Sequence, residues 1–214
     1  MDEEITIIDS NTRSEKIKIF FIDNKKKIIA GLLIIFILTI GFLSMKEIKE
    51  RNKIRLANQF NKMIINFKTE NKQTTVDQLK NLVKQNDSTY SPLALYFLID
   101  NNLIDNNNEI NILFDELINE TILDEEIKNL IIYKKALFNS GFSLENDLLQ
   151  ILKPIINSES IWKSHSLYLM AEYYYSKNQK QKAKEFFNQI IILPNSNSDI
   201  KIESKKRLNR DFSE

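Results

Sequence analysis

The sequence contains one long uncharged run, Ile28-Ile-Ala-Gly-Leu-Leu-Ile-Ile-Phe-Ile-Leu-Thr-Ile-Gly-Phe-Leu-Ser-Met45. At a helical rise of about 1.5 Å per residue, the run would extend for about 27 Å, close to the thickness of the hydrocarbon core of a bilayer. It is apolar on every face of a helix, and lysines mark both ends. The predicted organisation is a tail of residues 1–27, a transmembrane helix of residues 28–45 and a larger helical domain of residues 46–214.

A cleaved signal peptide is the alternative interpretation of this run. The apolar part of a signal peptide is usually about 7–15 residues long and is followed by a cleavage site of small residues. Here the run begins only after residue 27, and no site of the A-x-A type follows Phe42. The sequence therefore favours an uncleaved signal anchor.

The direction of the span depends on the basic residues near its two ends, because cytoplasmic flanks carry an excess of lysine and arginine. The count is a tie. The residues before the span are Arg13, Lys16, Lys18, Lys25, Lys26 and Lys27, and those after it are Lys46, Lys49, Arg51, Lys53, Arg55 and Lys62. Because the cluster of Lys25 to Lys27 adjoins the apolar run directly, we expect the N-terminus on the cytoplasmic side.

Composition limits what the rest of the chain can do. The sequence has 30 basic and 29 acidic residues, and this balance provides no basic surface for nucleic acid. Cysteine is absent, which excludes disulfides and thiolate metal sites. Nucleotide bias in the source genome would explain the abundance of isoleucine, asparagine and lysine, so single Asn or Lys residues carry little functional weight.

The part after Met45 has the features of an all-α domain. It holds one glycine, Gly141, and its three prolines stand at possible helix junctions. Apolar residues recur at helical spacing, which indicates one-sided helices that need partners. The clearest sets are Leu56, Phe60, Met63 and Phe67; Val76, Leu79, Leu82 and Val83; and Leu93, Tyr96, Phe97 and Leu103. Polar breaks at residues 69–74, 86–91, 105–108 and 195–198 divide the chain into the antiparallel helix pairs of a bundle or an α-solenoid.

An internal repeat favours the solenoid. The last pair reads Leu167-x-x-Met170-Ala171-x-x-Tyr174, then eight residues, then Ala183-x-x-x-Phe187-x-x-Ile190, with Pro194 closing it. This pattern resembles the tetratricopeptide (TPR) repeat. We expect the small residues Ala171 and Ala183 to let the two helices approach each other, and the rings of Tyr174 and Phe187 to fill the space between neighbouring pairs.

Earlier copies of the pair are more degenerate. They begin near Leu56, Pro92 and Lys128, before the last one near His165, at a spacing of about 36 residues. In the third copy, Leu148, Leu149 and Leu152 fit a second helix that ends near Pro154. An amphipathic helix over residues 200–210 would cap the exposed end of the array.

Four features follow one another along nearly the whole chain: a tail with the segment Ile8-Asp-Ser-Asn-Thr-Arg-Ser-Glu-Lys16, a single span, a charged helix from Lys46, and TPR-like pairs that end at Pro194. In this order the chain resembles the YfgM-like ancillary subunits of the Sec translocon, in which an aromatic residue often precedes the last pair, as Trp162 does here. The resemblance implies a bacterial inner-membrane protein with a cytoplasmic N-terminus and a periplasmic repeat domain. It also implies association with the translocon, with exported proteins or with periplasmic chaperones.

Candidate catalytic and metal-binding residues are few. His165 is the only histidine, and its place at a predicted helix start indicates a structural or surface role. A partial calcium-loop pattern is formed by Asp105, Asn107, Glu109 and Glu116, but Ile110 stands where that loop requires glycine.

The remaining chemical motifs are also missing. The acidic run Asp124-Glu-Glu126 lies at a predicted helix start, where negative charge interacts favourably with the helix dipole. Glycine occurs only at positions 31, 41 and 141, so no glycine-rich phosphate loop is possible. We therefore expect no enzymatic activity, no catalytic residue, no cofactor and no metal ion.

Aromatic residues gather in the last pair, namely Tyr168, Tyr173, Tyr174, Tyr175, Phe186 and Phe187. Solenoids bind extended peptides along concave faces, so this cluster is a candidate surface. Helical spacing places Tyr174 in the core and points Tyr173 and Tyr175 elsewhere. Packing within or between pairs explains the cluster best, and no binding residue is assigned.

The sequence thus leads to a non-enzymatic scaffold, anchored in the bilayer, that binds proteins and neither nucleic acid nor a small-molecule substrate. A structural assembly factor for a cell-envelope or respiratory membrane complex is the alternative. An enzyme accessory or sensor domain is a third, weaker possibility.

Overall fold

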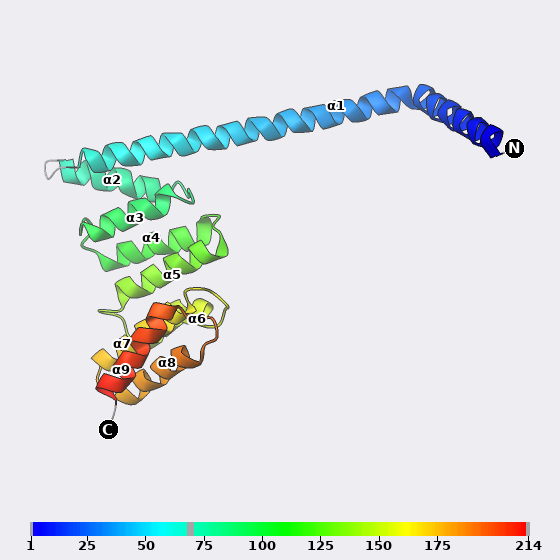
Figure 1. The fold of residues 1–214 in the computed structure, drawn as a ribbon. Helices are drawn as coiled ribbons and strands as arrows, with labels where there is room; N and C mark the ends of the chain where they lie inside the picture. The colour runs from blue at the N-terminus through cyan, green and yellow to red at the C-terminus, as the bar shows by residue number, and fades with distance from the viewer. Residues whose placement is uncertain (1, 68–70, 213–214) are drawn as a thin grey trace. The chain divides into compact units, whose positions relative to one another are not determined.

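The computed structural model describes residues 2–67 and 71–212, with side chains from residue 15 onward. In these residues every regular element is an α-helix and there is no strand, so the predicted all-α class is confirmed (Figure 1). The helices are α1 (Asp2–Ile65), α2 (Lys72–Val83), α3 (Tyr90–Asp100), α4 (Asn107–Glu120), α5 (Glu125–Asn139), α6 (Glu145–Ile156), α7 (Lys163–Ser176), α8 (Lys180–Ile192) and α9 (Ser198–Asp211).

The chain divides into two compact units, residues 1–55 and residues 56–214. Helix α1 makes up the described part of the first unit and continues into the second. It contains a stretch long and apolar enough to cross a membrane, and no residue of that stretch is buried. The core helix of a water-soluble protein is covered by its neighbours, so this helix does not belong to that class.

The second unit is built from helices that pack in chain order. Each helix from α2 to α9 contacts the next one, and α2 also contacts α4, α5 contacts α7, and α7 contacts α9. The unit begins at Leu56, where the first pair is predicted to start. The other predicted pair starts, Pro92, Lys128 and His165, fall in the first turns of α3, α5 and α7.

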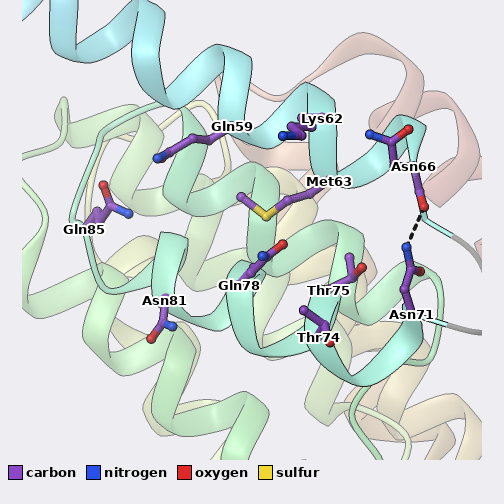
Figure 2. A pocket seen from close by; sticks show the side chains of 10 residues that line it. All are labelled: Gln59, Lys62, Met63, Asn66, Asn71, Thr74, Thr75, Gln78, Asn81 and Gln85. Atoms are coloured by element: carbon purple, nitrogen blue, oxygen red, sulfur yellow. Dashed lines mark hydrogen bonds between the residues drawn. The ribbon is translucent and has the colours of Figure 1, made fainter.

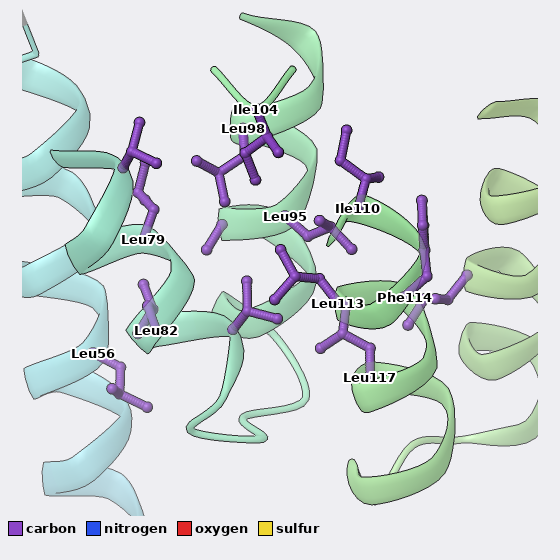
Figure 3. Close-up of a cluster of buried hydrophobic side chains, with 14 residues drawn as sticks. Leu56, Leu79, Leu82, Leu95, Leu98, Ile104, Ile110, Leu113, Phe114 and Leu117 are labelled. Atoms are coloured by element: carbon purple, nitrogen blue, oxygen red, sulfur yellow. The ribbon is translucent and has the colours of Figure 1, made fainter. Parts of the chain in front are cut away.

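Two hydrophobic clusters form the core of this unit. The first joins the end of α1 with α2, α3 and α4, and Figure 3 shows leucines from these helices pointing toward one another. The second joins α5, α6, α7 and α8, with α9 packed against it. The two clusters meet along α5, where Ile131 belongs to the first cluster and Ile132 to the second.

Asparagine ends several helices in a chain that has little glycine. Asn86, Asn102 and Asn178 have φ angles of 54°, 49° and 59°, in the left-handed region. After α3, the amide of Leu103 donates to the carbonyl of Leu98 at 2.9 Å, and that of Asn102 donates to Ile99 at 3.0 Å. This is the hydrogen-bond pattern of a Schellman cap, in which Asn is the residue that best replaces glycine.

One helix boundary differs from the prediction. Helix α2 already begins at Lys72, so the second half of the predicted break at residues 69–74 is helical, while residues 68–70 lie outside the described part. Helix α6 passes through Pro154 and ends at Ile156. A proline in the last turn removes one backbone hydrogen bond but leaves the preceding turns intact, so the helix tolerates it there.

The buried face of α3 also differs from the prediction. Ala94, Leu95 and Leu98 are fully buried, whereas Leu93 is 41% exposed. Because α3 is apolar on almost every face, helical periodicity could not identify the side that its neighbours cover.

Truncation of Phe114 tests the first cluster. This ring is 1% exposed and packs against Phe138, so Phe114→Ala is expected to lower the free energy of unfolding by about 3–5 kcal/mol. Ile112 lies in the same helix and is 64% exposed, and Ile112→Ala is the matched control, with an effect within about 0.5 kcal/mol. Urea denaturation of the detergent-solubilised protein measures both values. Equal losses for the two variants would contradict this core.

Candidate functional site

The aromatic cluster of the last pair is mostly part of the packing. Tyr173 and Tyr174 are buried, with 7% and 2% exposure, and Phe187 is fully buried. The hydroxyl of Tyr173 donates to the backbone carbonyl of Ser143 at 3.1 Å, and that of Tyr174 donates to Glu145 at 2.9 Å. These hydroxyls therefore tie α7 to the start of α6, and the cluster does not form an open binding surface.

A buried cation joins α9 to α7. Arg207 of α9 is 9% exposed, and its guanidinium donates to both carboxylate oxygens of Glu172 in α7 at 2.7 Å. It also lies 4.4 Å from the ring centroid of Tyr175 and pairs with Asp211. Two carboxylates and an aromatic face compensate the desolvation of this charge, so its role is structural.

The only histidine stands beside the only tryptophan. The rings of Trp162 and His165 are 5.1 Å apart, and Tyr133 of α5 stacks on Trp162 at 5.8 Å. Nδ1 of His165 is buried and has no hydrogen-bond partner among the described residues. Burial lowers the pKa of His165, and the carbonyl of Ile161 only partly opposes that shift. The ring lies against Trp162 and against Tyr133 of α5, an arrangement typical of packing between helices.

The acidic residues singled out by the sequence fall into two groups, one along α4 and one at the start of α5. Glu109, in the first turn of α4, pairs with Lys80 of α2 at 2.6 Å, and Glu116 lies further along the same helix. Asp124 occupies the N-cap position of α5 without a side-chain capping hydrogen bond to a described residue, and Glu125 and Glu126 lie in the first turn of that helix, as predicted. Among the described residues no three His, Cys, Asp or Glu side chains are placed to hold a metal ion.

A polar pocket of about 510 Å³ lies between the end of α1 and α2. Figure 2 shows Met63 pointing into it, and Asn71 donating to the backbone carbonyl of Asn66 at 2.8 Å. Side-chain amides and hydroxyls dominate the lining, which consists of Gln59, Lys62, Met63, Asn66, Asn71, Thr74, Thr75, Gln78, Asn81 and Gln85. Amides donate and accept hydrogen bonds but do not titrate, so the pocket offers recognition without acid–base chemistry.

An apolar groove of about 360 Å³ lies between α3 and α5, and we call it the α3–α5 groove. Its apolar wall includes Leu93 and Ile127, which are 41% and 42% exposed. Polar residues stand with them, and the complete lining is Ser88, Thr89, Pro92, Leu93, Tyr96, Leu123, Asp124, Ile127, Leu130 and Ile131. Half-exposed aliphatic side chains beside polar ones are typical of surfaces that bind protein segments.

Tyr96 gives this groove a further property. Its hydroxyl is buried without a hydrogen-bond partner in the described part of the chain, and burial raises its pKa to about 12. The ammonium of Lys134 lies 5.5 Å from its ring centroid. An unpaired buried hydroxyl carries a free-energy cost, and because protein atoms cover this oxygen, a segment lying in the groove does not reach it directly.

Sequence reasoning placed Leu93 and Tyr96 on a core-facing side and did not identify this groove. A signal was present, because residues 90–99 carry more apolar side chains than one buried face requires. These additional apolar side chains indicated a second apolar surface on the helix but did not indicate what that surface contacts.

Protonation of His165 is expected to destabilise the fold. Since its pKa lies below the ordinary value of 6.5, its contribution is fully present above pH 6.5 and is lost as the pH falls through the lowered pKa. Urea midpoints of the wild type should therefore decrease from pH 7.5 to about pH 5.5 more than those of His165→Phe. The fluorescence of Trp162 reports the same titration, because imidazolium quenches indole. An identical pH dependence of the urea midpoint in both proteins would refute the lowered pKa of His165.

Comparison of the chain with protein-family models, with characterised proteins and with solved structures found no match. The geometry of the helices and grooves is therefore the basis for assigning a function.

Proposed function

We propose that this chain is a single-span membrane protein whose helical domain binds other proteins beside the bilayer. The observation that carries the proposal is α1, in which a wholly unburied apolar stretch continues without a break into the core residue Leu56. Water does not tolerate a contiguous apolar surface of this size, and a bilayer covers it on every face. The backbone of a helix also satisfies its own hydrogen bonds in lipid.

A TPR-like solenoid is the arrangement we propose for the domain. Its support is a recurring sequence separation between polar partners. Most polar contacts between elements have separations of 28–37 residues; they join Asn111 to Asn139, Asn86 to Thr121, Glu126 to Ser160, Ser143 to Tyr173, Glu145 to Tyr174 and Lys182, Ser164 to Asn197, and Glu172 to Arg207. Asp115 and Lys135, at a separation of 20, and Leu82 and Ser91, at 9, are exceptions. A repeat of about 34 residues would place equivalent positions in contact in this way.

The α3–α5 groove is the surface that we assign to protein binding. It combines exposed aliphatic residues with the hydroxyls of Ser88 and Thr89 and the carboxylate of Asp124. A bound peptide would place apolar side chains against the aliphatic residues and form backbone hydrogen bonds with the hydroxyls and the carboxylate.

The partner and the membrane side follow from the resemblance to YfgM-like proteins. We propose an ancillary subunit of the Sec translocon in the bacterial inner membrane, with residues 1–27 in the cytoplasm and the helical domain in the periplasm. Anchoring beside the translocon raises the effective concentration of the groove near emerging exported chains and their chaperones.

Site-specific crosslinking tests the binding surface, and a chain without cysteine is well suited to it. A photoreactive label on Leu93→Cys should capture translocon subunits and several exported proteins or chaperones. The same label on Ile112→Cys, an exposed isoleucine outside the groove, should not. A single stoichiometric folded partner would instead favour the structural assembly factor. Equal crosslinking from both positions would refute the assignment of the α3–α5 groove as the binding surface.

The orientation has its own test. A topology reporter fused after Glu214 should be active only in the periplasm, and added protease should degrade the domain once the outer membrane is opened. Reporter activity confined to the cytoplasm would exclude the translocon role.

A further inference from the structure

We infer that the part of α1 before the span, Lys16–Lys27, binds the surface of the bilayer through anionic lipid headgroups. This inference rests on the proposed span and adds a second contact to it. The segment lies in the first unit, and its large apolar residues are uncovered: Ile17, Ile19, Phe20, Phe21 and Ile22 are between 54% and 60% exposed.

Helical geometry gathers three of these residues on one face. At about 100° per residue, Ile17, Phe20 and Phe21 lie within an arc of about 100°, in line with Ile28 at the start of the span. Asn24 lies on the same face, but its side-chain amide donates to the backbone carbonyl of Phe20 at 3.0 Å, which reduces its demand for water. The two phenylalanine rings contact each other edge to face at 6.0 Å.

Lysines border this face on both sides. Lys16 and Lys27 flank it along one edge, and Lys18 and Lys25 flank it along the other. The remaining face carries Glu15, Asp23 and Lys26 together with Ile19 and Ile22. An aromatic face between two rows of lysine is typical of helices that lie in a membrane interface, where the ammonium groups reach toward phosphate while the rings enter the acyl boundary.

The position of the segment Lys16–Lys27 along the chain also supports binding to the bilayer surface. Phe20 is eight residues before Ile28, so an upright helix would hold it about 12 Å outside the hydrocarbon core. The headgroup layer is only about 5–8 Å thick on each side, so the ring would stand in water. If the segment Lys16–Lys27 tilts, or bends at Lys25 to Lys27, toward the bilayer, both phenylalanines leave water and the four flanking lysines reach the headgroups. The positive edges favour a leaflet with negative lipids.

Single-cysteine labelling of the full chain in nanodiscs tests this surface. An environment-sensitive fluorophore is placed at Ile17→Cys, or at Ile19→Cys as the matched control, since the two isoleucines point about 160° apart. In bilayers with about a quarter phosphatidylglycerol, nitroxide-bearing lipid should quench the label at position 17 about fivefold more than that at position 19, and aqueous iodide should show the reverse order. Equal quenching of the two positions would overturn the inference.

Two further variants of the Ile17→Cys protein test whether the charge of the flanking lysines is required. Replacement of Lys16, Lys18, Lys25 and Lys27 by glutamine should lower the equilibrium constant between the lipid-facing and water-facing states of the label by about fivefold for each lysine at the surface, whereas replacement by arginine should preserve it. A label that stays lipid-facing in the glutamine variant would overturn the role of anionic lipid.

A label at Ile35→Cys separates this inference from the proposed span. If position 35 is quenched by lipid while position 17 is reached only by iodide, the surface contact is refuted and the span is retained. If iodide reaches position 35 as well, the span itself is refuted.

Discussion

The constraint on which the helical domain depends is that none of its helices is stable alone. The helices from α2 to α9 contain 11–15 residues, a length at which an isolated helix in water is marginal. Each must therefore bury its apolar face between its predecessor and its successor, and the contacts along the chain follow that order. The structure is held together by local packing rather than by contacts between distant parts of the sequence.

The same constraint applies differently at the two ends of the helical domain, because an end helix has a neighbour on one side only. At the first end, the last turns of α1 cover α2 with Leu56 and Phe60. At the other end, α9 is mostly polar, and its buried residues are Ser204 and Arg207. A paired guanidinium over an aromatic ring gives α9 a firm contact while its outer face remains hydrophilic.

Helix type and spacing could be predicted from the sequence because they depend on which residues are apolar. The set Val76, Leu79, Leu82 and Val83 is buried as predicted, and the predicted cap over residues 200–210 lies within α9. Where a helix is apolar on all sides, the sequence could not predict which neighbour covers each face. Helix α3 is such a case: it packs between α2 and α4, and Leu93 is left at the α3–α5 groove. The left-handed caps at Asn102 and Asn178 were also missed, since a sequence rich in asparagine gives such positions no distinguishing signal.

The apolar pattern of helix α1 changes along its length. Over residues 28–45 it is apolar on every face, whereas from Leu56 onward its apolar residues recur every three or four positions, as packing against one side of a domain requires. The stretch between them is charged and is stabilised locally, for example by the pair of Glu47 and Arg51 at 2.7 Å. Because Leu56 and Phe60 belong to the first core cluster, fraying of this end of α1 would uncover α2 and α3. The helix that forms the proposed anchor therefore also completes the fold of the domain.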